Sequence, residues 1–191
     1  IRDSPLSPKF VNKISFNDPK AIEIQFRYAF VVDADGFHSV DVTDKDKIQK
    51  VASVKLEDAR NLYVARTYAY VAGGSQGLVI VDVEKADKPF IDQTYNDEGK
   101  IDDLSDVKVA TTNASLFAYL ADGKNGFKIV QLTDPERVPE FYGFSPRPKP
   151  KLIAQKKTHG PALAISKGLD RDRAVDEDGH QVSVFGRIGS R

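Results

Sequence analysis

The sequence predicts an all-β protein built from repeated four-stranded antiparallel units. Three segments of similar pattern recur along the 191 residues, each with an aromatic-Ala-aromatic triplet, a turn glycine and an aliphatic run. The turn glycines Gly36, Gly77 and Gly126 are separated by 41 and 49 residues. A period of roughly 40–45 residues is typical of a β-propeller blade, which is one four-stranded sheet. We therefore expect about four such blades in this stretch, either as a small closed ring or as part of a larger propeller.

The first strand of the first unit shows the alternation of a half-buried strand. Ile22, Ile24 and Phe26 alternate with polar residues, so one face of the strand is apolar. The second strand carries the triplet, which reads Tyr28-Ala29-Phe30, Tyr68-Ala69-Tyr70 and Phe117-Ala118-Tyr119. A turn rich in Gly, Asp, Asn or Ser follows, because tight hairpins need backbone angles that these residues tolerate.

The third strand of each unit is a more continuous apolar run. This strand is expected at residues 78–83 and 127–132, and the apolar run is continuous at Leu78-Val79-Ile80-Val81. Such runs suit strands that are covered on both faces, and packing of one blade on the next would provide that cover. A polar turn then opens the fourth strand, which we expect at residues 51–56 and 90–95.

The repeats divide the chain into six parts. The first is the outer strand of an incomplete blade, three blades follow, and a Pro- and Lys-rich linker or docking arm precedes a degenerate blade or C-terminal extension. These parts are residues 1–18, 19–58, 59–106, 107–143, 144–159 and 160–191. The linker is expected because alternating prolines favour extended backbone outside a sheet. In the degenerate blade, strands are expected around Leu163 and Ile165 and around Val182 and Val184.

A family resemblance rests on residues 78–82, which read LVIVD. This pentapeptide resembles the signature of the LVIVD-repeat family of β-propeller proteins, and the likeness extends over residues 20–142 as three repeats. The pentapeptide becomes FHSVD at 37–41 and FKIVQ at 127–131. The resemblance implies a propeller fold and an extracytoplasmic protein, exported or at the cell surface. It also implies a module of a larger chain or assembly, in some relatives beside c-type cytochromes.

The composition bounds the function further. Lys and Arg number 28, as do Asp and Glu, so the net charge is zero and binding to nucleic acid by bulk charge is not expected. The apolar runs are too short for a membrane span. Because the chain has no Cys, we expect no disulfide, and any haem would come from another chain or segment. The chain also has no Met, so we expect Ile1 to be a processed or truncated end.

Acidic turns and histidines are the candidate metal ligands. Carboxylates in Gly-containing turns can bind Ca²⁺ through several oxygens, and imidazole can bind a metal or a haem iron. The same carboxylates commonly cap turns by accepting hydrogen bonds from backbone amides, and this alternative stays open. The candidates are Asp33, Asp35, Asp122, Asp176, Asp178, His38, His159 and His180.

Although the net charge is zero, the chain contains two stretches of opposite charge. Residues 92–106 hold six acids and one base, whereas residues 144–158 hold five bases and no acid. Such stretches can pair within the chain, pair between copies, steer a partner, or remain solvated. The residues expected to bind a partner are Arg147, Lys149, Lys151, Lys156, Lys157, Asp97, Glu98, Asp102 and Asp103.

Three functions follow from these features. The leading hypothesis is a non-catalytic interaction or scaffold module that binds a protein partner or its own copies. An alternative is an accessory or coat domain of an extracellular multihaem cytochrome assembly. The other alternative is a propeller enzyme or Ca²⁺-binding propeller that uses Asp and His at one end of the channel. Asp18, Asp58 and Asp106 occupy corresponding places before the first strand of each unit and could line that end.

Overall fold

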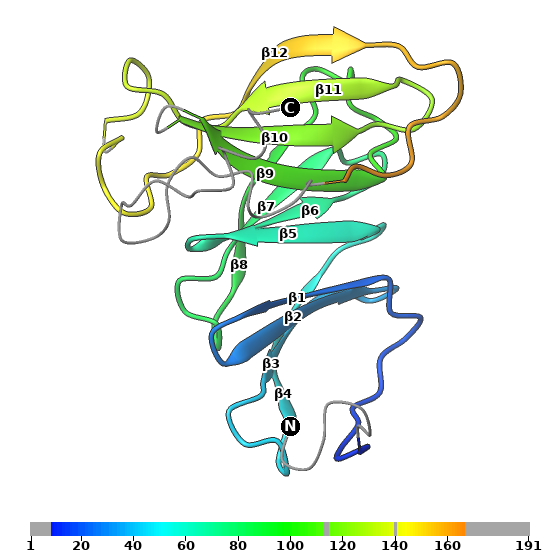
Figure 1. Cartoon of the computed structure of the whole chain (residues 1–191), viewed down its shortest axis with the longest axis vertical. Helices are drawn as coiled ribbons and strands as arrows, with labels where there is room; N and C mark the ends of the chain where they lie inside the picture. The colour runs from blue at the N-terminus through cyan, green and yellow to red at the C-terminus, as the bar shows by residue number, and fades with distance from the viewer. Residues whose placement is uncertain (1–8, 113–114, 140, 167–191) are drawn as a thin grey trace, which may run out of the picture.

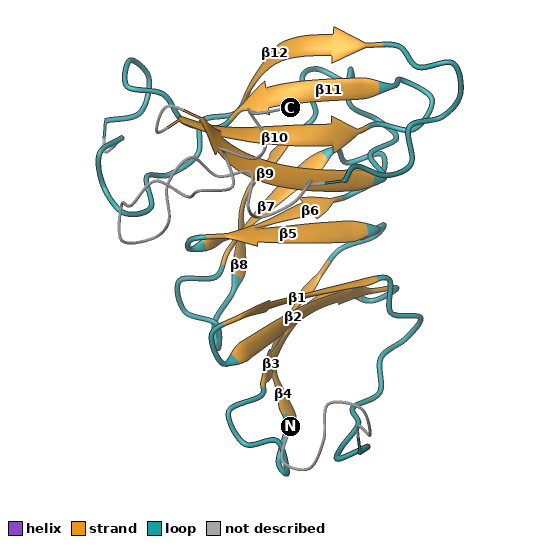
Figure 2. Ribbon diagram, viewed as in Figure 1, coloured by secondary structure: helices purple, strands orange, loops and turns teal. Residues whose placement is uncertain are grey.

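Twelve β-strands form three separate four-stranded antiparallel sheets in the computed structural model, which describes residues 9–112, 115–139 and 141–166. Figure 1 shows these sheets following one another along the molecule, and Figure 2 shows strands and loops without a helix in this part of the chain. No helix of the described residues could therefore cross a membrane. The predicted all-β class and the repeated four-stranded units are confirmed.

Each sheet is a meander in which consecutive strands are neighbours. The first blade contains β1 (Ala21–Gln25), β2 (Tyr28–Asp33), β3 (Gly36–Asp41) and β4 (Gln49–Lys55). The second contains β5 (Asn61–Ala65), β6 (Tyr68–Ala72), β7 (Leu78–Asp82) and β8 (Phe90–Tyr95). The third contains β9 (Asp106–Thr112), β10 (Ser115–Ala121), β11 (Phe127–Gln131) and β12 (Lys151–Lys156). The expected strands at residues 51–56 and 90–95 correspond to β4 and β8.

The core lies between successive blades. Val79 of β7 and Leu62 of β5 belong to the cluster shared with the first blade, whereas Ile80 of β7 belongs to the cluster shared with Val107 of the third blade. Successive side chains of β7 therefore point to opposite neighbours, as the pleat of a strand requires. The second blade is covered on both faces, which explains the continuous apolar run of residues 78–81. The strands β1, β5 and β9 lie one above another in Figure 1.

Turn glycines let the fourth strand of a blade approach the turn that joins its second and third strands. Gly77 has φ +79°, and a Cβ atom on it would lie 2.6 Å from the carbonyl oxygen of Tyr95. Gly126 has φ +85°, and its Cβ would lie 2.4 Å from the carbonyl oxygen of Lys156. Both the conformation and the close approach of the neighbouring strand therefore require glycine. These positions are two of the three glycines that define the sequence period.

The third blade extends beyond residue 143, where the sequence placed its end. Strand β12 (Lys151–Lys156) supplies its outer strand and pairs with β11. The expected linker at 144–159 is therefore wrong for this part of the stretch. The strand escaped detection because only Leu152 is partly buried in it, so no apolar periodicity marks an edge strand of this kind. Pro146, Pro148 and Pro150 precede β12, so they lie outside the hydrogen-bonded pairing of β11 with β12.

The expected strands near both ends also differ from the structure. Residues 9–16 form no strand, and Ile14 and Phe16 instead pack on the first blade. Residues 1–8 lie outside the described part. Leu163 and Ile165 form no strand either, although Ala162 makes an isolated bridge with Gly123. A single bridge anchors this segment without forming a strand ladder, and the second expected strand, at Val182 and Val184, lies outside the described residues.

Candidate functional site

The acidic turn of the first blade holds a buried hydrogen-bonded chain of three side chains. His38 is nearly buried, and its Nε2 lies 2.7 Å from Oδ1 of Asp33, which is fully buried. The Nδ1 atom of the same ring lies 2.8 Å from Oγ of Ser53, on the exposed side of the outer strand β4. Phe16 covers the imidazole at a ring-centroid distance of 5.5 Å. The order Ser-His-Asp could pass a proton, but its environment resembles a packed sheet more than an open cleft.

The carboxylate of Asp33 is held by the turn that it closes. Its oxygens accept hydrogen bonds from the backbone amides of Asp35, Gly36 and Asn17. Burial alone would raise the pKa of Asp33, but the hydrogen bonds from His38 and from the amides of Asp35 and Asn17 outweigh it and lower the pKa below its usual range. This arrangement is the turn-capping role that the sequence left open as an alternative.

The third blade repeats the buried pair with lysine in place of histidine. Strand register makes Asp122 equivalent to Asp33, and Lys128 equivalent to His38. The ammonium group of Lys128 donates to Asp122 and to the carbonyl oxygen of Lys100, and both charged side chains are buried. In the second blade the equivalent positions hold Gly73 and Val79. Since an apolar pair can replace the ionic pair, these residues serve the packing of a blade more than a shared reaction.

The other predicted metal ligands are scattered. Asp35 accepts a hydrogen bond from the side chain of Asn17 at 2.9 Å, and His159 lies exposed in a loop. Asp176, Asp178 and His180 lie outside the described residues. Within the described part of the chain, no three His, Cys, Asp or Glu side chains gather closely enough to hold a metal ion. The structure therefore brings together only Asp33 and His38 among the candidates that it describes.

The acidic residues that precede the first strand of each blade correspond in a different way from the one predicted. The amides of Lys20, Arg60 and Ser105 bond the equivalent carbonyls of the three hairpins, so Asp103, two residues before Ser105, corresponds to Asp18 and Asp58. Asp106 is the first residue of β9 instead. The longer loop of the second unit obscured this correspondence. The alignment of Asp18, Asp58 and Asp106 is thus corrected by three residues in the third blade.

Arg60 bridges two of these carboxylates. Its Nη2 lies 2.8 Å from Asp58, and its Nη1 lies 2.9 Å from Asp103. Hydrogen bonds to Asp58 and Asp103 raise the pKa of Arg60, and the bond from Arg60 in turn lowers the pKa of Asp103. The lead-in segments of the second and third blades are therefore joined by this guanidinium.

The two charged stretches meet at one ion pair among the described residues. Arg147 Nε lies 3.0 Å from Asp92 Oδ1 and fixes the loop before β12 on the second blade. Most acids of the loop after β8 pair with other cations: Asp97 with Lys100, Asp102 with Lys124, and Asp103 with Arg60. The hydrogen bonds from Lys100 and Tyr95 lower the pKa of Asp97.

The remaining predicted partner residues lie at the surface. Glu98 and Lys149 are exposed, as are Lys151 and Lys156 at the two ends of β12 and Lys157 just after it. A role for these residues in partner binding stays a prediction.

The free face of the first blade differs from its counterparts. Ile22 and Ile24 on β1 are 60% and 66% exposed. In the next blades, Leu62 and Val107 occupy the place of Ile22 and are 1% and 0% exposed, because each packs on the preceding blade. The first blade therefore presents two aliphatic side chains in the position of an interblade contact. Ile14 and Phe16 cover other parts of this face but leave these two open.

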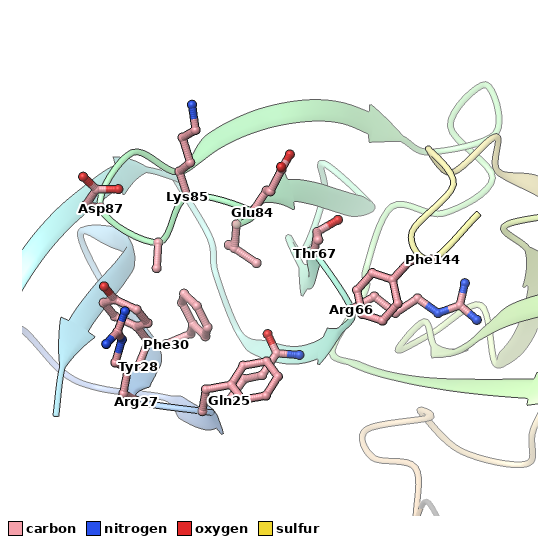
Figure 3. A pocket seen from close by; sticks show the side chains of 13 residues that line it. Gln25, Arg27, Tyr28, Phe30, Arg66, Thr67, Glu84, Lys85, Asp87 and Phe144 are labelled. Atoms are coloured by element: carbon pink, nitrogen blue, oxygen red, sulfur yellow. The ribbon is translucent and has the colours of Figure 1, made fainter. Parts of the chain in front are cut away.

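A cleft of about 800 Å³ lies where hairpin turns of the first two blades meet. Figure 3 shows Tyr28 and Phe30 on one side and Phe144 with Arg66 on the other. Its walls come from the β1–β2 turn, the β5–β6 turn, the β7–β8 loop and the loop after the third blade's β11. The lining residues are Gln25, Phe26, Arg27, Tyr28, Phe30, Arg66, Thr67, Val83, Glu84, Lys85, Ala86, Asp87 and Phe144.

Two hydrogen bonds and one ring contact fix the walls of this cleft. The hydroxyl groups of Thr67 and Ser145 are 2.6 Å apart, and the amide of Thr67 donates to Ser145 Oγ at 3.3 Å. These bonds hold the loop that carries Phe144 against the β5–β6 turn. On the opposite wall, the guanidinium of Arg27 lies 6.0 Å from the ring centre of Tyr28. The cleft is therefore built by ordered side chains of separate elements.

None of the sequence patterns described above predicts this cleft. Its signal is the pair Phe26-Arg27 in a two-residue hairpin turn, where Gly or Asn is the usual choice. A second overlooked pattern is Gly73-Gly74-Ser75-Gln76-Gly77, which matches the G-x-S-x-G spacing of hydrolase nucleophiles. Here the segment joins the strands β6 and β7, whereas a nucleophile elbow joins a strand to a helix. We assign no nucleophile to Ser75.

Comparison with known proteins adds one match to this geometry. The family model described as the LVIVD repeat matches residues 57–96 and 115–137, which cover all four strands of the second blade and the β10–β11 hairpin of the third. No curated protein matches the chain.

Proposed function

Because the chain carries LVIVD repeats in a propeller-like fold, we propose that it is a non-catalytic interaction module. The open face of β1 carries this proposal. The same sheet position is an interblade contact in the second and third blades, and the first blade offers Ile22 and Ile24 there with no further blade among the described residues to cover them. An exposed aliphatic pair on an otherwise regular face favours burial against another polypeptide.

The occupant that we propose for this face is a second copy of the chain. An apolar strand face can complement itself across a two-fold axis, and isologous dimers are the commonest assemblies of soluble proteins. Glu23 separates the two isoleucines along β1, points to the other face of the strand and would lie outside the contact.

Sedimentation velocity of the full chain tests this proposal. We expect a species of twice the 21.1 kDa chain mass, and one-chain mass for an Ile24→Asp variant that still unfolds in one cooperative thermal transition. Phe90→Asp is the matched control, because Phe90 is also exposed but lies on the outer strand β8. A parent that sediments as one chain, or an Ile24→Asp variant that remains paired, would contradict the proposal.

The proposal includes a location outside the cytoplasm, which rests on the family resemblance. Fractionation of the native cells, with antibody detection of the chain, tests it, and a purely cytoplasmic signal would refute it. The cytochrome-associated and Ca²⁺-binding alternatives stay predictions, since no contact of the described residues favours either. The chain itself requires no haem under this proposal, and a haem would belong to a partner.

A further inference from the structure

The cleft between the first two blades combines exposed aromatic rings with backbone strain. Phe26 is 93% exposed and has φ +54°. Arg66 occupies the equivalent turn position of the second blade and has φ +58°. A bulky residue in this region is uncommon, because its side chain clashes with the backbone and Gly or Asn is preferred.

This strain has no packing benefit that the structure shows for Phe26. Its ring buries little surface, so a glycine would satisfy the hairpin better. Strained conformations that persist at a surface cleft are typical of functional positions. Phe144, also highly exposed at 79%, lines the same cleft and is held there through Ser145. Two aromatic side chains from distant parts of the chain are thus displayed at one opening.

The charges of the cleft indicate the chemistry of its ligand. Arg27, Arg66 and Lys85 contribute three cations, whereas Glu84 and Asp87 contribute two carboxylates. Aromatic residues and Arg are enriched in protein interfaces, and both are used here at the rim. The two carboxylates disfavour a continuous phosphate backbone or an anionic bilayer, which would meet them as like charges.

We propose that this cleft binds a protein segment that inserts one aromatic or aliphatic side chain between Phe26 and Phe144. A carboxylate next to that side chain pairs with Arg66 or Arg27 at the rim. The inserted residue packs toward Tyr28 and Phe30, on the side of the cleft opposite Phe144. The inference rests on the proposed interaction function and assigns it a second surface, separate from the open face of β1.

Selection of peptides against the full chain tests the inference. A random peptide library displayed on phage is the probe, and the enriched peptides are then synthesised and measured by fluorescence anisotropy. We expect an apolar residue beside Asp or Glu in the enriched peptides. Their affinity should fall at least about 10-fold with Phe144→Ser, because a central aromatic anchor dominates such contacts. Phe26→Asn should have the same effect while it keeps a residue suited to positive φ.

Tyr142→Ser provides the matched control. Tyr142 is an exposed aromatic residue of the same loop but does not line the cleft, so its removal should leave peptide affinity unchanged. Arg66→Gln should weaken binding and reduce its dependence on salt. The inference is overturned if no peptide is enriched, or if the peptides bind the Phe26 and Phe144 variants as tightly as the parent. It is equally overturned if single-stranded DNA or anionic vesicles compete for the cleft.

The two proposals fail independently. Ile24→Asp should abolish the dimer and leave peptide affinity unchanged, whereas Phe144→Ser should do the reverse. A peptide that loses affinity only with Ile24→Asp would assign recognition to the β1 face and refute the cleft.

Discussion

The buried pair Asp122–Lys128 should behave as a coupled unit in the stability of the third blade. Lys128 is 2% exposed, and Asp122 is fully buried. Lys128→Met leaves a carboxylate that still accepts bonds from the amide of Asp103 at 2.9 Å and from Asn125 at 3.1 Å. Asp122→Asn leaves a buried ammonium without its counter-charge, because its acceptors are then neutral: the amide oxygen of the new side chain and the carbonyl oxygen of Lys100. Breaking a buried pair from one side costs about 3–5 kcal/mol, so we expect the larger loss for Asp122→Asn.

The double variant should cost less than the sum of the two single changes. It removes both charges, as the second blade does with Gly73 and Val79 at the equivalent positions. We expect about 2 kcal/mol or more of coupling and a fall of about 10 °C in melting temperature for the worse single variant. Urea unfolding followed by circular dichroism measures the unfolding free energies and hence the coupling, and thermal unfolding measures the melting temperature. Asp102→Asn, at the exposed pair with Lys124, is the control and should cost under about 1 kcal/mol. Single losses below about 1 kcal/mol, or strictly additive losses, would refute the reasoning.

The remaining predictions concern the core, a turn, the cleft rim and acid. Ile80→Asp should destabilise the chain by at least about 4 kcal/mol, because it buries a charge between two blades, and a melting temperature within about 2 °C of the parent would contradict this. Gly77→Ala should cost about 2 kcal/mol in urea unfolding, because the residue has φ +79° and its Cβ would meet backbone; no loss would disprove the steric argument. Phe26→Gly should raise the unfolding free energy by about 0.5 kcal/mol, because it relieves positive φ and loses little buried surface; a destabilised variant would show that Phe26 packs after all. The pKa of Asp33 is lower in the folded chain than in the unfolded chain, so as the pH falls the unfolded chain is protonated at this carboxylate first. The stability that the Asp33 carboxylate contributes is therefore complete above its ordinary pKa of 3.8 and is lost as the pH falls through the lower pKa of the folded chain. Asp33→Asn should flatten this part of the acid-unfolding profile, and an unaltered profile would exclude Asp33 as its source.

The blades could be predicted from the sequence wherever burial imposed a pattern. Strand β7 is covered on both faces, so its first four residues form an uninterrupted apolar run, and β8 was expected at the residues where it lies. Strand β12 could not be found in this way, because its side chains are mostly exposed and backbone pairing alone holds it. Edge strands of this kind leave no periodic signal in the side chains.

The candidate site was predictable only in part, for a different physical reason. Asp33 and His38 were selected as possible metal ligands, and the structure places them together as a buried pair. Their role depends on strand register, which makes Lys128 the counterpart of His38, and a sequence does not state its register. The cleft depends on residues even farther apart in the sequence. Phe26 and Phe144 belong to different blades, and only the folded chain brings both to the same cleft. The local sequence feature that marks the cleft is a bulky residue in a hairpin turn.

Mapping a selected peptide onto the chain by amide chemical shifts tests the central claim most directly. If the protein is an interaction module that recognises partners at the cleft, the shifted amides should gather in three turns. These are residues 25–30, 66–67 and 83–87, together with Phe144. Perturbations concentrated instead at the acidic turns, residues 33–36, 102–103 and 122–126, would contradict the account and place recognition at the opposite ends of the strands.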